Sequence, residues 1–287
     1  MEAASAKPSD RRVLAALLSL PFPGLGHAAR GHFARGAAWL VVDVAALALF
    51  ITHPHLWLVG ALGARLLSAA DAVIARPAQR GPAGGGIVAA AFGVWLGAQV
   101  VARLPIMVIA ETFKLPSNSM APTMVLGDHF TVLTTATPAR GDIVTFRHRA
   151  RTFVKRVIGV AGDVVDLYGT TLRLDGKVVS RELATPCTYD DLDLHQVVKK
   201  RCVSFEETLG QRRYRVIYDP ATAVHLSKKV TVPAGHVYLM GDNRDNSFDS
   251  RLMGPIKLSD VTGVAISIWW SAGPNGTLWR RIGTRLR

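Results

Sequence analysis

Two serines and one lysine are the residues of this sequence that could perform covalent chemistry together. Ser117 and Ser119 lie two positions apart in a stretch rich in turn residues, and Lys155 follows in a run of alternating apolar residues. A serine hydroxyl is a poor nucleophile until a neighbouring base accepts its proton. A lysine amine can be that base only when it is neutral, whereas its free pKa is about 10.4. The combination therefore predicts a serine nucleophile with a buried lysine as its base.

The sequence around Lys155 is suited to lowering the pKa of its amine. In an extended strand Phe153, Lys155 and Val157 share one face, while Arg156 faces the other way. Apolar neighbours on the shared face would destabilise the ammonium group and lower its pKa. On residue type alone, however, Lys155 could be a solvated strand lysine, and serines beside proline are commonly plain turn residues. The catalytic interpretation therefore depends on the surrounding motifs.

Four segments supply these motifs. They are Leu115-Pro-Ser-Asn-Ser-Met-Ala-Pro-Thr-Met-Val-Leu-Gly-Asp128, Arg140-Gly-Asp-Ile-Val-Thr-Phe146, Phe153-Val-Lys-Arg-Val-Ile-Gly-Val-Ala-Gly-Asp163 and Gly241-Asp-Asn-Arg-Asp-Asn-Ser-Phe-Asp-Ser-Arg251. In this order they resemble the conserved boxes of type I signal peptidases, the membrane-bound Ser–Lys proteases of bacteria and their organelle descendants. The resemblance covers most of residues 113–165 and 237–270. It is specific because four multi-residue motifs agree in order and spacing.

The resemblance implies a role for each matching residue. Ser119 corresponds to the nucleophile and Lys155 to the general base. Ser117 corresponds to the side-chain donor of the oxyanion hole, which the Ser119 backbone N–H completes, and Ser247 to the hydroxyl that helps to orient the lysine. The residues of the charged segment that supports this site are Asp242, Arg244, Asp249 and Arg251. The residues expected to line shallow pockets for small substrate side chains are Phe113, Leu115, Met120, Phe153 and Val154.

One residue departs from the family pattern inside the site. Asn118 stands between the two serines, where glycine is common in the family. A side chain there can alter the backbone freedom next to the nucleophile, but it removes no catalytic group.

Other kinds of site find less support in the sequence. The acidic run from Asp242 to Asp249 resembles a calcium loop at first sight, but it lacks the required glycine position and the terminal glutamate. Histidines are scattered and suggest no His–Asp–Ser triad. We therefore expect neither a metal nor another cofactor.

The first 110 residues predict a membrane region. Three stretches approach the roughly 20 apolar residues that a bilayer crossing needs, at about Gly36–Thr52, Leu56–Ala75 and Gly86–Ala110. The second carries Arg65 and Asp71, which are expected to face a partner helix rather than lipid. The competing interpretation is a set of core helices in a soluble protein. Residues 1–35 would form a cytoplasmic or interfacial segment before the three transmembrane helices at 36–110.

The distribution of basic residues predicts the topology. Lys7, Arg11 and Arg12 precede the first stretch, and Arg76 and Arg80 lie between the second and the third. The positive-inside rule then places the N-terminus in the cytoplasm and residues 111–287 outside a bacterial cytoplasmic membrane. The net charge of +13 is attributed to contact with anionic lipid headgroups, because no nucleic-acid-binding motif accompanies it.

Residues 111–287 predict a mainly β catalytic domain of the signal-peptidase-like kind, with an inserted β-rich region at about 166–233. Short, β-branched, alternating runs indicate strands, and Asp175-Gly176 is typical of a two-residue hairpin turn. Cys187 and Cys202 lie in the insert. In an oxidising compartment they could form a disulfide, and two free buried thiols are the alternative.

The function implied by the resemblance is removal of signal peptides from preproteins that leave the translocation machinery, after small residues in an Ala-x-Ala-like pattern. Three alternatives remain. The enzyme could be specialised for a single pilin or conjugation protein. It could be a self-cleaving repressor, although the apolar N-terminal region argues against that class. It could also be an inactive membrane scaffold, although both residues of the dyad are present.

Overall fold

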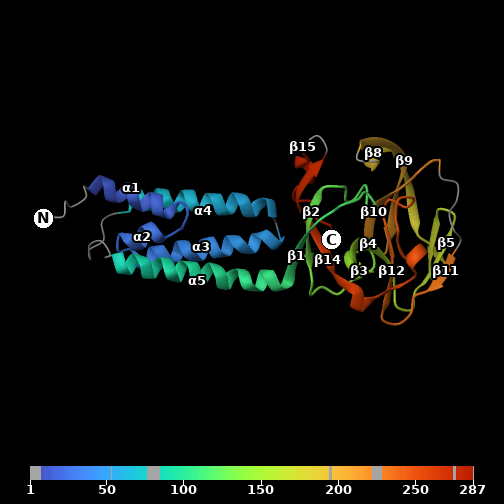
Figure 1. Cartoon of the computed structure of the whole chain (residues 1–287), viewed down its shortest axis with the longest axis horizontal. Coiled ribbons are helices and arrows are strands. Elements are labelled where there is room, and N and C mark those ends of the chain that lie inside the picture. The colour runs from blue at the N-terminus through green and yellow to red at the C-terminus, as the bar shows by residue number, and fades with distance from the viewer. Residues whose placement is uncertain are drawn as a thin grey trace. The chain divides into compact units, whose positions relative to one another are not determined.

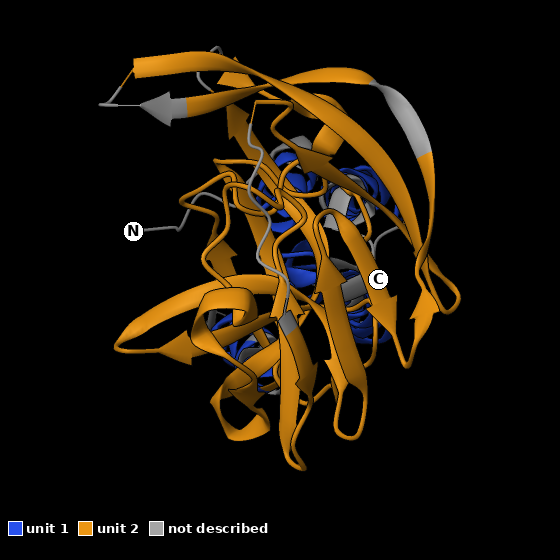
Figure 2. Ribbon diagram, turned by 90° about the vertical axis from the view of Figure 1, so that its right-hand side faces the viewer, with its two compact units in different colours: residues 1–108 blue, residues 109–287 orange. Residues whose placement is uncertain are grey.

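The computed structural model describes residues 8–52, 54–75, 85–193, 196–221, 228–273 and 276–286. The chain divides into two compact units, Met1–Val108 and Ile109–Arg287, which Figure 2 distinguishes by colour. The first unit is helical, and the second consists mainly of β-strands.

The helices of the first unit lie alongside one another (Figure 1). They are α1 (Pro8–Ser19), α2 (Leu25–Ala29), α3 (Phe33–Thr52), α4 (Pro54–Ile74) and α5 (Gly85–Ile109). Helix α4 packs against both α1 and α3. Phe22, in the turn after α1, makes edge-to-face contacts with Phe92 and Trp95 of α5, with ring centroids 5.0 and 4.8 Å away. Aromatic contacts therefore join α5 to the turn that leads into α2.

The charged residues of α4 face other helices, as the sequence indicated. Asp71 accepts hydrogen bonds from Trp39 Nε1 at 2.9 Å and from Arg35 Nε at 2.8 Å, both on α3. Arg65 forms an ion pair with Asp43 of α3 at 3.3 Å. Polar contacts thus reinforce the packing of α3 on α4.

The prediction of three membrane spans is not supported by these helices. Helices α3, α4 and α5 cover the three predicted stretches, but in the described part of the chain no helix combines the length and the apolarity of a membrane span. A bilayer crossing needs about 20 sustained apolar residues, and the described helices do not meet this requirement. Lys7, Arg76 and Arg80, on which the predicted topology relied, lie outside the described residues.

The largest sheet of the second unit carries the four motifs or their flanks. Its strands are β1 (Ala110–Lys114), β2 (Asp128–Leu133), β3 (Ile143–His148), β4 (Arg151–Val160), β12 (His236–Met240), β13 (Ile256–Lys257), β14 (Val261–Gly273) and β15 (Gly276–Thr277). They pair antiparallel in the order β1-β2-β14-β3-β4-β12-β13, with β15 beside β14 (Figure 1). The second unit is therefore mainly β, as predicted.

Two smaller antiparallel sheets occupy most of the predicted insert. One contains β5 (Val164–Tyr168), β6 (Thr171–Leu174), β7 (Lys177–Val178) and β11 (Lys228–Thr231) in the order β11-β5-β6-β7. The other contains β8 (Ser180–Asp193), β9 (Gln196–Leu209) and β10 (Arg212–Tyr218) in the order β10-β9-β8. Strands β8 and β9 form a long hairpin, which Figure 2 shows as an arched ribbon.

Strand β4 has an unusual burial pattern for a strand with two adjacent cations. Residues 154–159 are all buried, because β4 lies between β3 and β12 and both of its faces are covered. Lys155 is 2 % exposed and Arg156 is 3 % exposed, although they face opposite sides. The sheet therefore withdraws both cations from water, and each needs its own compensation.

Candidate active site

The amine of Lys155 lies next to the hydroxyl of Ser119. Lys155 Nζ is 2.8 Å from Ser119 Oγ and 2.8 Å from the carbonyl oxygen of Val154. Burial lowers the pKa of Lys155 to about 8, a shift that the negative charges of Asp249 and Asp242 oppose and Arg251 reinforces. A large part of the amine is therefore neutral near pH 8, in contact with the hydroxyl whose proton it would accept.

The loop before β2 presents both serines. The Ser119 carbonyl oxygen accepts a hydrogen bond from the Asn243 backbone N–H at 3.1 Å. The hydroxyl of Ser117 donates to Ser119 Oγ at 3.3 Å. Gly241 lies behind the nucleophile, where a Cβ would collide with Ser247 Oγ and with the Ser119 carbonyl oxygen. Residue 241 must therefore be glycine for the charged segment to approach the loop this closely.

Asp128 anchors the end of this loop, and sequence analysis gave it no role. Its fully buried carboxylate accepts from Arg281 Nε at 2.9 Å, from Ser271 Oγ at 2.6 Å and from the Val125 backbone N–H at 2.8 Å. Arg281 Nη2 also donates to the Thr123 carbonyl oxygen at 2.9 Å. The Gly-Asp pair that closes the first motif was the available signal, because a buried aspartate needs donors around it.

The charged segment divides into three parts with different partners. Asp249 is buried beside Lys155 and accepts from Ser247 Oγ at 2.7 Å and from Arg251 Nη2 at 2.8 Å. Burial alone would raise the pKa of Asp249, but the hydrogen bonds and charge of Arg251 outweigh it and lower this pKa. Among the described residues, the hydroxyl of Ser247 thus bonds to Asp249, and a direct bond to Lys155 stays a prediction.

Asp242 and Arg244, the other two parts of the charged segment, attach it to strands β4 and β9. Asp242 receives two hydrogen bonds from Arg156, at 2.8 Å from Nε and 2.6 Å from Nη2. Arg244 is fully buried and donates to both carboxylate oxygens of Glu207 on β9, at 2.8 and 2.5 Å. Sequence analysis missed Glu207, because nothing in the alternating pattern of β9 distinguishes it from the neighbouring Glu206. These bidentate pairs compensate the burial of both guanidinium groups.

The predicted pocket residues separate into two groups. Leu115 and Met120 are 1 % and 0 % exposed, and both belong to a hydrophobic cluster of the core. A substrate side chain cannot reach them in this conformation. Phe113 and Phe153 are partly exposed, and Val154 is buried next to Lys155. The two phenylalanines therefore remain the accessible candidates.

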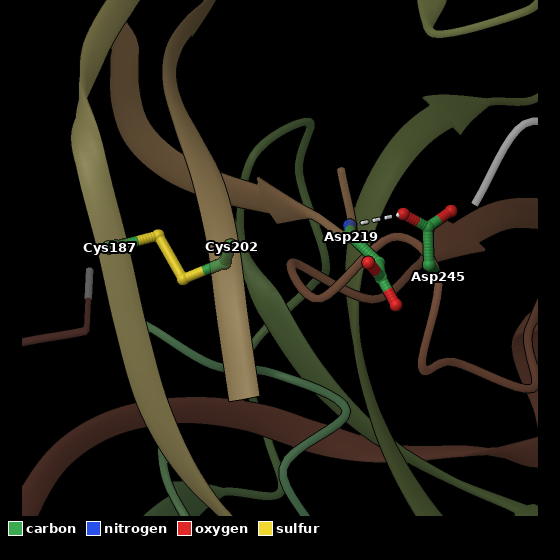
Figure 3. The surroundings of a disulfide bond; sticks show 4 residues. All are labelled: Cys187, Cys202, Asp219 and Asp245. Atoms are coloured by element: carbon green, nitrogen blue, oxygen red, sulfur yellow. Dashed lines mark hydrogen bonds between the residues drawn. A yellow bond between two sulfur atoms is a disulfide. The ribbon is translucent and has the colours of Figure 1, made fainter. Parts of the chain in front are cut away.

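Cys187 of β8 and Cys202 of β9 form a disulfide (Figure 3). The two residues face each other in the register of the hairpin, with their Cα atoms 4.9 Å apart. Cys202 packs in one buried cluster with Ala121, two residues after Ser119, and with Ile217 of β10. The bond therefore lies on the hairpin beside the loop that carries the proposed nucleophile.

The chain is similar to known proteins. The family described as "Signal peptidase, peptidase S26" matches residues 88–270. Signal peptidase I of Pseudomonas fluorescens is 33 % identical over 196 residues, which are 57 % of this chain and 66 % of that protein. Signal peptidase I of Pseudomonas aeruginosa is 30 % identical over 197 residues, with the same coverage. The match thus spans slightly less than two thirds of each relative.

A solved structure, signal peptidase I of Enterococcus faecalis, is 25 % identical, with a TM-score of 0.27 over 45 % of this chain and 97 % of that one. The family match covers well over half of the chain and includes Ser119, Lys155 and the charged segment. The chain therefore belongs to the signal peptidase family, peptidase S26.

Proposed function

We propose that this protein is a serine endopeptidase that removes signal peptides from exported preproteins with a Ser119–Lys155 dyad. The contact of 2.8 Å between Lys155 Nζ and Ser119 Oγ, combined with the lowered pKa of Lys155, carries the proposal. The substrate class is taken from the relatives, which are named signal peptidase I.

The reaction would begin at the hydroxyl of Ser119. Ser119 Oγ attacks the carbonyl carbon of the scissile bond while neutral Lys155 Nζ takes its proton. The Ser119 backbone N–H and the Ser117 hydroxyl donate to the oxyanion of the tetrahedral intermediate. Protonated Lys155 then gives the proton to the leaving amine, which departs as the N-terminus of the mature protein. Water, deprotonated by Lys155 in turn, hydrolyses the ester and frees Ser119.

The specificity for small side chains is part of the proposal. An Ala-x-Ala-like site fits the burial of Leu115 and Met120, because these two side chains belong to the core and offer no accessible apolar surface to a substrate. Bulky side chains at the −1 and −3 positions would find no deep pocket among these residues.

We also infer that the helical unit attaches the enzyme to the bacterial cytoplasmic membrane, with the catalytic unit on the outer side. Large apolar side chains that are more than half exposed occur on α3, α4 and α5, and they include Val41, Leu62, Leu66, Leu67, Val94 and Val101. Exposed apolar surface of this extent is typical of a lipid or protein contact. Membranes washed with alkaline carbonate should retain the protein, and release into the wash would contradict the attachment.

The test of the activity is cleavage of a preprotein in detergent micelles. The wild type should cut after the Ala-x-Ala site, as N-terminal sequencing of the product would show, and not after a matched site with phenylalanine at −1. Ser119→Ala and Lys155→Ala should be inactive. Ser180→Ala and Lys177→Ala, which change exposed residues, should cleave like the wild type. Absence of wild-type cleavage would refute general signal peptidase activity, and cleavage of a single pilin-type substrate would favour the specialised enzyme.

A further inference from the structure

Asn118, the residue between the two serines, has an unusually complete set of hydrogen bonds. Its side chain is buried, and Nδ2 donates to the Asp190 carbonyl oxygen at 2.7 Å and to Asp191 Oδ1 at 3.1 Å. Its Oδ1 accepts from the Leu126 backbone N–H at 2.8 Å. The amide group therefore ties the beginning of the loop to its end and, through Asp190 and Asp191, to strand β8.

Asp191 joins this contact to the charged segment. Its carboxylate is largely buried and accepts from Asn118 through Oδ1 and from Asn246 Nδ2 through Oδ2 at 3.1 Å. Lys200 of β9 forms an ion pair with Oδ2 at 2.9 Å. A carboxylate accepts several hydrogen bonds at once. The side chain of Asp191 can therefore hold both the loop that carries Ser119 and the charged segment.

The hairpin that presents Asp191 is itself firmly held. The Cys187–Cys202 disulfide joins its two strands four residues before Asp191 (Figure 3). Cys202 packs against Ala121 of the loop. Asp191 is therefore anchored by the hairpin ladder and the disulfide, in addition to its contact with the loop.

The peptide group between Asn118 and Ser119 is the element that these contacts orient. Its N–H belongs to Ser119 and is the backbone donor expected for the oxyanion. Its carbonyl oxygen, on Asn118, accepts from the Ala121 N–H at 3.0 Å and from Asn243 Nδ2 at 3.2 Å. With the side chain of Asn118 also bound, this peptide plane has little freedom to rotate. Oxyanion donors act efficiently only when they are pre-oriented.

We propose that Asp191 is a positioning residue for the active site, which acts through Asn118 to fix the backbone N–H of Ser119 towards the oxyanion. The kinetic consequence rests on the proposed peptidase function, whereas the mechanical consequence does not. Loss of the Asp191 carboxylate leaves the hairpin ladder and the disulfide in place, but it frees the side chain of Asn118 from one of its anchors. A displacement of about 1 Å in an active site can cost about 100-fold in rate.

The test compares Asp191→Ala with Asp190→Ala in the full-length enzyme. Asp190 is exposed, and it contacts Asn118 only through its carbonyl oxygen, which the substitution preserves. This control removes the same charge from the neighbouring position. Asp191→Asn is the conservative variant, because it retains an oxygen acceptor for Asn118.

The kinetic readout is peptide cleavage. Asp191→Ala should lower kcat about 10- to 100-fold with little change in KM, in Tm or in the apparent pKa of the pH–rate profile. Asp190→Ala should behave like the wild type, and Asp191→Asn should recover most of the activity. Equal kcat in the two alanine variants would overturn the proposal. A loss of kcat that is accompanied by a clear fall in Tm would also overturn it, because that pattern indicates a structural role.

Hydrogen exchange supplies a readout that requires no substrate. The Leu126 N–H, which donates to Asn118 Oδ1, should exchange at least about tenfold faster in Asp191→Ala than in Asp190→Ala, because opening is easier when Asn118 is less restrained. Unchanged exchange would overturn the proposal even if cleavage fell. If the wild type cleaves no signal-peptide substrate, the proposed function fails, and the exchange rates alone decide the positioning role.

Discussion

Replacement of Lys155 by methionine should stabilise the fold at neutral pH while it abolishes cleavage. The pKa of Lys155 falls from its ordinary value of 10.5 to about 8 because the amine is buried. This difference corresponds to about 3 kcal/mol, since each pKa unit represents about 1.4 kcal/mol. Below pH 8 both the folded and the unfolded chain carry the charge, and the folded state bears the full cost of burying it.

The free-energy cost of burying the charged amine of Lys155 depends on pH. Between about pH 8 and pH 10.5 the unfolded chain still binds the proton that the folded chain has lost, so wild-type stability rises with pH in this window. Above pH 10.5 both states are neutral and the cost disappears. The advantage of Lys155→Met in the free energy of unfolding should therefore be about 3 kcal/mol larger at pH 7 than at pH 11.

Urea unfolding, followed by tryptophan fluorescence at a series of pH values, measures this difference. Lys177→Met is the matched control, because Lys177 is exposed and its substitution should leave the pH dependence of stability unchanged. The reasoning would be refuted if the stability difference between Lys155→Met and the wild type were the same at pH 7 and pH 11. In that case the amine would not bear a desolvation cost in the folded state.

Three further variants test other parts of the chain. Ser117→Ala should lower kcat by about 10²- to 10³-fold with little effect on KM in a peptide cleavage assay, because one oxyanion donor is lost; an unchanged kcat would exclude that role. Removal of the disulfide by Cys187→Ser with Cys202→Ser should lower the free energy of unfolding by about 3 kcal/mol, as expected for a separation of 15 residues; urea unfolding with no change would contradict this. Glu207→Ala should destabilise the fold by about 3–5 kcal/mol, because fully buried Arg244 loses its only carboxylate partner among the described residues; thermal unfolding measures it, and a neutral effect would argue that water replaces the carboxylate.

Much of the catalytic unit could be predicted because its strands have simple alternating patterns. Alternating residues form β5 (Val164–Tyr168) and β12 (His236–Met240), and the predicted Asp175-Gly176 turn joins β6 to β7. The dyad was recognisable because both residues lie in motifs with conspicuous composition. The motifs identify the two residues but not their contact. That contact forms in the folded protein, where the loop that carries Ser119 lies against Lys155 of β4.

The remaining features depend on contacts between distant segments. Strands β8 and β9 were not identified as one long hairpin, because Pro186 and several charged residues interrupt the alternation. The bonds of Asn118 to β8 span more than 70 positions of sequence, so the departure from glycine was visible while its partner was not. The burial of Arg156 was also hidden, because alternation normally implies one solvated face and residues 154–159 of β4 have none.

The most direct test of the dyad is detection of the covalent intermediate. A peptide substrate is mixed with the full-length enzyme, the reaction is quenched in acid within one turnover, and the digested protein is examined by mass spectrometry. The account predicts the N-terminal half of the substrate attached as an ester to Ser119 in the wild type, and no adduct in Lys155→Ala. An acyl group on Ser117, or cleavage by Ser119→Ala at the wild-type rate, would contradict it.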